Sequence, residues 1–163
     1  MDIRHIKASD IMKSEVVKVF PETTLHQLAK VLQENRISGV PVVDHSNKLL
    51  GVVSQTDIIR FYATFPLTRK GIHPYFKTDE KTGASEEASV LKDAIDDFGE
   101  HRVDEIMNKE TFAFQETVSV SKIAKAMTEM HMHRVIIVDE DLNLSGIISS
   151  LDFVRLIGEL DRE

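Results

Sequence analysis

The sequence predicts an α/β (α+β) protein built from two pseudo-symmetric copies of one β-α-β-β-α unit. The first observation is an internal repeat: residues 8–61 align without a gap with residues 103–156, at a fixed offset of 95, and 14 of the 54 aligned positions are identical. The second observation is that short β-branched runs alternate with helical patterns in the same order in both copies. The third is that the segment between the copies has a different composition and matches neither of them.

The first copy begins with a predicted strand and helix. Residues 16–20 are short, rich in valine and followed by Pro21, which is typical of a strand with a defined end. Thr24 followed three residues later by Gln27 resembles a capping box and predicts the start of a helix. Leucine and alanine then recur on one helical face, so this helix should pack on a core.

Two further strands and a second helix complete the unit. Residues 40–43 and 50–54 are apolar runs joined by the polar residues 44–48, which predicts a hairpin of largely buried strands. A helix is expected to begin near Thr56. The second copy repeats this order at residues 111–115, 120–130, 135–138, 145–149 and 151–160.

The segment between the copies gives three predicted regions: residues 1–65, 66–102 and 103–163. Residues 79–105 contain ten acids and three bases, and 10 − 3 = 7 negative charges equals the whole net charge of −7. We expect an ordered helical insertion, although residues 78–85 alone could be a flexible tether. One apolar helical face is predicted at Val90, Leu91, Ala94, Ile95 and Phe98.

Composition excludes several functional classes. Without cysteine there is no disulfide, thiolate metal site or cysteine nucleophile. The sequence shows no lysine and arginine stripe for nucleic acid, no apolar run of about 20 residues for a membrane span, and no signal peptide, so a cytoplasmic protein is expected. A metal site is not predicted, because His131 and His133 lack a third placed ligand. Phosphate-loop, nucleophile-elbow, zinc-protease and dinucleotide motifs are also missing, so we do not expect an enzyme.

Three landmarks recur in both copies. Each copy opens with Asp/Glu-Ile-Met, continues with an apolar strand that ends in Asp, and closes with Gly-hydrophobic-hydrophobic-Ser-x-x-Asp. They occupy residues 10–12, 38–44 and 51–57, then 105–107, 133–139 and 146–152. Together they resemble the CBS domain family, over about two thirds of the chain. This resemblance implies two CBS units packed through their sheets into a Bateman module.

The resemblance also implies a ligand and its contacts. CBS pairs bind adenosyl ligands in clefts between the copies, where the Asp of Ser-x-x-Asp receives the ribose hydroxyls and the Ser contacts phosphate or ribose. Residues before the central strand and at the start of the last helix line the same clefts. The implied nucleotide-binding residues are Ser38, Gly39, Ser54, Thr56, Asp57, His133, Arg134, Ser149, Leu151 and Asp152.

Elementary chemistry is consistent with these roles and also offers an alternative. A carboxylate can accept from both vicinal hydroxyls of a ribose, and a helix start and the fork of Arg134 suit a phosphate. However, Ser-x-x-Asp is also a helix capping box, and both roles can coexist. The copies differ at Ser38-Gly39 against His133-Arg134, which predicts one better and one poorer nucleotide site.

The last helix of each copy is unusually apolar. The positions concerned are Ile58, Ile59, Phe61, Tyr62 and Phe65, then Phe153, Val154, Leu156, Ile157 and Leu160. This arc is wider than one packing contact needs. A homodimer interface formed by these helices is the favoured interpretation, and a helix wedged in its own core is the alternative.

These observations lead to three functional hypotheses. The favoured one is a regulatory module that binds AMP, ADP or ATP, with S-adenosylmethionine a less favoured ligand, requires no cofactor and signals to an effector protein in trans. The second is a ligand-free dimerisation scaffold with degenerate clefts. The third is a small hydrolase using His131, His133 or a pair of acids, and no motif supports it.

Overall fold

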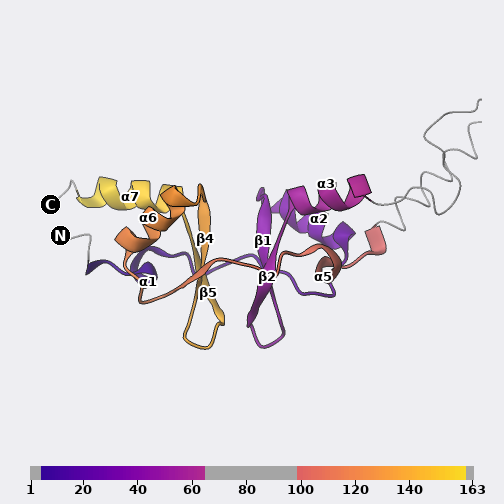
Figure 1. Cartoon of the computed structure of the whole chain (residues 1–163), viewed down its shortest axis with the longest axis horizontal. Coiled ribbons are helices and arrows are strands. Elements are labelled where there is room, and N and C mark those ends of the chain that lie inside the picture. Colours follow the sequence, from indigo (N-terminus) through magenta and orange to yellow (C-terminus); the bar gives the residue numbers. More distant parts are fainter. Residues whose placement is uncertain (1–4, 65–98, 161–163) are drawn as a thin grey trace, which may run out of the picture. The chain divides into compact units, whose positions relative to one another are not determined.

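The computed structural model describes residues 5–64 and 99–160. The predicted acidic helix and Phe65 lie outside these residues. The first copy contains α1 (Ala8–Ile11), α2 (Leu25–Glu34), β1 (Gly39–Val43), β2 (Leu49–Ser54) and α3 (Gln55–Thr64) (Figure 1). The second contains α5 (Val103–Ile106), β3 (Ala113–Gln115), α6 (Val120–Glu129), β4 (Arg134–Val138), β5 (Leu144–Ser149) and α7 (Ser150–Leu160).

The predicted mixed α/β fold and the order of its elements are confirmed, with one exception. Strands β1 and β2 form one sheet, and β3, β4 and β5 form another, in which β3 runs parallel and β5 antiparallel to β4. The strand predicted at residues 16–20 is wrong. Only Val19 is buried there, and it makes an isolated parallel bridge to Val42. Because Val17 and Phe20 are exposed, this segment lacks the apolar contacts that would hold a longer ladder.

Helix α2 begins as its sequence predicts. The Gln27 N–H donates to Thr24 Oγ1 at 3.2 Å, and the Thr24 N–H donates to Gln27 Oε1 at 3.0 Å. This reciprocal pair satisfies two backbone donors that the first helical turn leaves open. The helix then buries Leu28 and Leu32 completely or nearly so.

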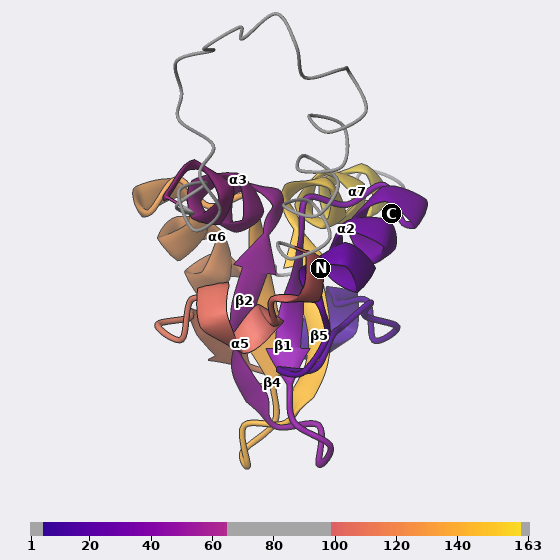
Figure 2. The ribbon, with the colours of Figure 1, turned by 90° about the vertical axis from the view of Figure 1, so that its right-hand side faces the viewer.

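The chain divides into two compact units, and each combines residues of both copies. Unit 1 contains the described residues of 1–20, 41–52 and 108–163, and unit 2 contains those of 21–40 and 53–107. In unit 1, α1 of the first copy contacts α7 and β5 of the second. In unit 2, α5 of the second copy contacts α3 of the first (Figure 2). The short opening helices are therefore exchanged between the copies.

The exchange explains the glycine in the closing motif. In unit 1, Lys13 forms two backbone hydrogen bonds with Ile147, of 2.9 and 3.0 Å. A Cβ at the neighbouring Gly146 would lie 2.7 Å from Met12 Sδ. At the equivalent Gly51, a Cβ would lie 2.4 Å from the backbone oxygen of Asn108. At both positions a side chain would collide with the exchanged segment that crosses directly over the glycine, with its backbone at Gly51 and mainly with the Met12 side chain at Gly146.

The core of unit 1 joins strands from the two sheets. Val43 of β1 packs with Ile136, Val138 and Leu144 of β4 and β5. At the end of the sheets the two hairpin turns lie side by side, and the Leu49 N–H donates to the Leu142 oxygen at 3.0 Å (Figure 2). Within unit 1, this confirms the predicted packing through the sheets. No helix in residues 5–64 and 99–160 is long and apolar enough to cross a membrane.

Candidate functional site

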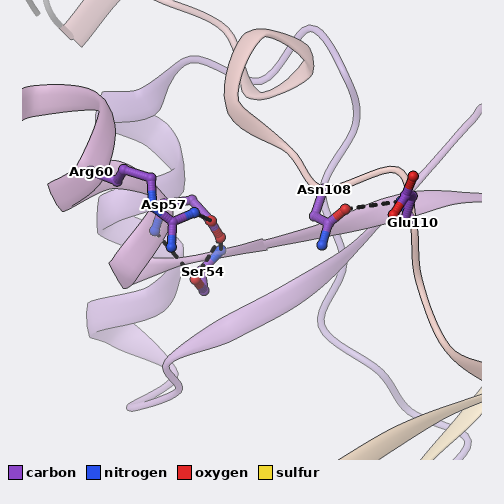
Figure 3. A network of polar contacts seen from close by, with 5 residues as sticks. All are labelled: Ser54, Asp57, Arg60, Asn108 and Glu110. Carbon is purple, nitrogen blue, oxygen red and sulfur yellow. Dashed lines mark hydrogen bonds and ion pairs between the residues drawn. The ribbon is translucent and has the colours of Figure 1, made fainter. Parts of the chain in front are cut away.

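The structure brings the predicted residues of the first copy together in unit 2. We call Ser38, Gly39, Ser54, Thr56 and Asp57 the Asp57 cluster. Ser54 donates to Asp57 Oδ2 from its hydroxyl at 2.5 Å and from its backbone N–H at 2.8 Å (Figure 3). The Gln55 N–H donates to the Ser38 oxygen at 2.9 Å, so the residues before β1 lie beside the start of α3.

The predicted residues of the second copy gather in the same way in unit 1. We call His133, Arg134, Ser149, Leu151 and Asp152 the Asp152 cluster. Ser149 donates to Asp152 Oδ2 from its hydroxyl at 2.6 Å and from its backbone at 2.8 Å. Arg134 is the cross-strand partner of Ser149, and the His133 oxygen accepts from the N–H of the residue that follows Ser149, at 3.0 Å.

Both interpretations of Ser-x-x-Asp remain compatible with this geometry. The carboxylate does cap its helix, since Oδ2 takes both serine donors and the Asp57 N–H donates back to Ser54 Oγ at 3.3 Å. Oδ1 takes no part in the cap. Each cluster therefore combines a fixed carboxylate oxygen, a hydroxyl and a helix start, the groups that a ribose phosphate needs.

Basic side chains beside each carboxylate are the residues that sequence reasoning missed. Arg60 lies 3.4 Å from Asp57 Oδ1, and Arg155 lies 3.3 Å from Asp152 Oδ1. These arginines are identical in the repeat and stand three residues after the Asp, so their pairing was readable as a helical i, i+3 contact. Lys13 Nζ lies 3.3 Å from Asp152 Oδ1. This contact depends on the exchange of the opening segments, and no local sequence pattern predicts that exchange.

The two carboxylates differ in burial. The Asp152 side chain is 2% exposed and the Asp57 side chain 15%. Burial raises the pKa of Asp152, but hydrogen bonds from Ser149 and the pair with Lys13 outweigh it, so that pKa lies below its usual value. Asp152 is the one buried charged side chain among the described residues.

Asn108 of the second copy occupies the position equivalent to Lys13, but its side chain makes a different kind of contact. Asn108 Oδ1 accepts the Glu110 N–H at 2.9 Å (Figure 3). An amide that is committed to its own turn carries no charge to offer a carboxylate. The exchanged segments thus give the copies different electrostatic partners at equivalent positions.

The aspartates that end the central strands have a structural role. Asp44 Oδ1 accepts the N–H groups of Ser46 and Lys48, at 2.8 and 2.9 Å, and so closes the hairpin turn. Asp139 does the same in the second copy, where the Asn143 side chain and backbone hold the pKa of its carboxyl below the usual value. These carboxylates are occupied by the turn and do not belong to either cluster.

No metal centre is apparent in the part of the chain that the structure describes. Residues 5–64 and 99–160 hold no group of three or more histidine or acidic side chains that could bind a metal ion. His131 has φ 53°, as does its repeat equivalent Arg36. This shared left-handed residue gives both copies the same turn between α2 or α6 and the following strand.

Part of the apolar arc predicted on the last helix of the second copy is buried within the chain. Leu156 is buried with Ile6 and Val120, and Phe153 packs against the same core, because the exchanged α1 segment covers that side of α7. Val154 remains exposed, as do Leu151 and Ile157, which lie three positions before and after it. The exposed apolar side chains are Ile59 and Tyr62 on α3 and Leu151, Val154 and Ile157 on α7. Thr64 is the last described residue of α3.

Comparison with known proteins identifies the family. The CBS domain model matches residues 8–64 and 103–159, so the chain belongs to the CBS domain family, in two copies. The chain is 27% identical over 154 residues to the uncharacterized protein MJ1426 of Methanocaldococcus jannaschii, with 91% of this chain and 89% of that protein covered. It spans 40% of MJ1232 from the same organism, so some relatives are much longer.

Solved structures of CBS pairs share the fold. CBSX2 in complex with AMP superimposes with a TM-score of 0.69 at 21% identity, covering 96% of this chain and 98% of that one. The CBS domain pair of MJ0100, in complex with 5′-methylthioadenosine and S-adenosyl-L-methionine, gives a TM-score of 0.64 at 21% identity, covering 94% and 97%. The tandem CBS fold is therefore established.

Proposed function

We propose that this protein is a regulatory module that binds an adenine nucleotide, AMP, ADP or ATP, and signals its occupancy to an effector protein in trans. The observation that carries the proposal is the duplicated carboxylate, fixed by its serine at the start of a helix, in the Asp57 and Asp152 clusters. That CBSX2 was solved with AMP, and MJ0100 with two other adenosyl compounds, supports the choice of ligand class.

Within each cluster, one group would recognise the ribose of the nucleotide and another group its phosphate. The Oδ1 side of the carboxylate, which takes no part in the helix cap, accepts the vicinal ribose hydroxyls in charge-assisted hydrogen bonds. The backbone N–H groups at the start of α3 or α7 attract the phosphate. His133 and Arg134 add further donors in the second copy, where Ser38 and Gly39 offer none with a charge.

A thermal-shift titration with AMP, ADP, ATP and S-adenosylmethionine tests this function. A ligand that binds only the folded protein raises the midpoint as its concentration passes Kd. We expect at least one adenine nucleotide to stabilise the wild type, and Asp57→Ala and Asp152→Ala each to reduce the shift. Asp141→Ala, which removes an exposed carboxylate of the second copy outside the clusters, is the matched control. If no nucleotide shifts the midpoint, or if the control loses as much as the cluster variants, the proposal fails.

The effect of a nucleotide is expected to be binding without turnover. No catalytic motif supports a hydrolase, so AMP, ADP and ATP incubated with the protein and divalent metal should be recovered unchanged by ion-exchange chromatography. Metal-dependent release of phosphate that survives a further purification step would favour the hydrolase hypothesis instead.

We also propose that the protein forms a homodimer through α3 and α7. Their exposed apolar residues follow a spacing of three in both copies, with Ile59 at 67% and Val154 at 63% exposure. Such stripes favour a helix-packed interface. Sedimentation velocity should report a dimer that Ile59→Asp and Val154→Asp weaken. Phe112→Asp, at a position 60% exposed outside these helices, is the control. A dimer without any nucleotide binding would instead favour the scaffold hypothesis.

A further inference from the structure

Lys13 reaches the Asp152 cluster from the opposite copy. It follows α1 in the opening segment of the first copy, and its backbone is held by the two hydrogen bonds to Ile147 of β5. Its ammonium lies 3.3 Å from Asp152 Oδ1. The Lys13 side chain is 53% exposed while that of Asp152 is 2% exposed, so a half-exposed lysine pairs with a buried carboxylate.

This ion pair occupies the carboxylate that a ribose would need. Oδ2 of Asp152 accepts both donors of Ser149, and Oδ1 is shared by Lys13 and Arg155. A ribose diol that approaches Oδ1 must therefore displace the Lys13 ammonium. Losing that partner is costly for a buried carboxylate unless the ammonium finds another anion nearby.

Within residues 5–64 and 99–160, no lysine pairs with the Asp57 carboxylate, so this obstacle is absent there. Asp57 Oδ1 has Arg60 at 3.4 Å, and the Asp57 side chain is more exposed than that of Asp152. The repeat position of Lys13 is the uncharged Asn108. A neutral ribose can hence reach this carboxylate without breaking a lysine ion pair.

We propose that Lys13 is a specificity-determining latch, which restricts the Asp152 cluster to ligands that carry a phosphate on the ribose. The phosphate draws the ammonium away from Oδ1, and the freed oxygen accepts the ribose hydroxyls. Both charges then keep a partner. An unphosphorylated nucleoside offers no second anion, so the latch stays closed, whereas the Asp57 cluster accepts both kinds of ligand. This inference rests on the proposed nucleotide-binding function.

Isothermal titration of the full chain carrying Asp57→Ala isolates the Asp152 cluster. With Lys13 present, AMP should bind at least about tenfold more tightly than adenosine, which is the scale of one charge-assisted contact. Adding Lys13→Asn, the residue of the other copy, should strengthen adenosine binding by at least about threefold and so narrow the ratio of the two affinities, while the start of α7, His133 and Arg134 still favour AMP. Lys13→Gln repeats the test should the asparagine variant be unstable, and Lys13→Arg should keep the preference because it keeps the charge. Lys125→Asn removes an exposed lysine of α6 that belongs to neither cluster and lies 3.8 Å from Glu129, and it should change nothing.

The outcomes separate the latch from the function on which it rests. If AMP binds the Asp57→Ala protein and the ratio of AMP to adenosine affinity is unchanged by Lys13→Asn, the latch is wrong while nucleotide binding stands. Equal affinities for AMP and adenosine with Lys13 present also overturn it. If neither ligand binds even the wild type, the proposed function itself fails, and the latch fails with it.

Discussion

The two Ser-x-x-Asp clusters share the same internal hydrogen bonds but differ in the residues that surround them. Both fix their carboxylate with the same serine donors and hold an arginine three residues later. Among the residues that the structure describes, a lysine pairs with Asp152 but not with Asp57, and Asp152 is the more deeply buried of the two. The lysine comes from the exchanged opening segment of the other copy. The exchange therefore determines which side chain lies beside the Asp152 carboxylate. A duplicated motif therefore does not make two equal sites.

The largest expected effect concerns the glycines under the exchanged segments. Gly51→Ala should lower the free energy of unfolding by about 3 kcal/mol and Gly146→Ala by about 1–2 kcal/mol. The reason is that the new Cβ meets a backbone oxygen at 2.4 Å at Gly51, but mainly the flexible Met12 side chain at Gly146. Urea unfolding measures both.

Gly158→Ala provides the matched control for this pair. A Cβ there would meet nothing within 4 Å, and the residue lies inside helix α7. This variant should gain about 0.5–1 kcal/mol from helix propensity. Equal losses of unfolding free energy in Gly51→Ala and Gly146→Ala would contradict the predicted difference between the two positions where an exchanged segment crosses a glycine.

The next largest effect is expected when the carboxylate of each cluster is replaced by an amide, because the two clusters should lose different amounts of stability. Asp152→Asn should lower the free energy of unfolding by about 2 kcal/mol, because the buried side chain then loses its charge-assisted hydrogen bonds from Ser149 and its ion pairs with Lys13 and Arg155. Asp57→Asn should lower it by only about 1 kcal/mol, the value of a helix cap at a more exposed position. Denaturant unfolding at neutral pH compares the variants. A larger loss at Asp57 would reverse the assignment of the more strongly held carboxylate.

The pH dependence sharpens the same contrast. The pKa of Asp152 is lower in the folded protein than its usual value of 3.8, so the unfolded chain binds the proton more readily. The stabilisation is complete above pH 3.8 and disappears as the pH falls through the folded pKa. Asp152→Asn should accordingly flatten the acid side of a stability-against-pH curve. An unchanged slope in that variant would exclude the Asp152 ion pair as its source.

The smallest effect is expected at the hairpin turns. Leu142 and Asn47 occupy equivalent positions with φ of 68° and 72°, a left-handed conformation that asparagine tolerates better than leucine. Leu142→Asn should raise the free energy of unfolding by about 0.5–1 kcal/mol, as measured by thermal unfolding. Asn47→Leu should lower it, since Asn47 Nδ2 also donates to the Leu144 oxygen at 2.9 Å. A loss of stability in Leu142→Asn would show that the leucine side chain serves a contact that outweighs the strain.

Much of the fold and half of the site chemistry could be predicted from the sequence. The capping box at Thr24, the apolar hairpins and the repeated Ser-x-x-Asp are local patterns, and each has a local physical cause. The short helices α1 and α5 could not be placed, because four-residue helices leave too little periodicity. Lys13 was missed for a different reason: its partner lies 139 positions away along the chain, and only the exchange of opening segments brings them together.

A crystal structure of the protein grown with AMP tests the central claim most directly. We expect the ribose hydroxyls within hydrogen-bonding distance of Asp57 Oδ1. At the Asp152 cluster we expect Lys13 Nζ on the phosphate and the ribose on the vacated Oδ1. An AMP molecule bound away from both carboxylates, or seated at Asp152 with the Lys13 ion pair intact, would contradict the account.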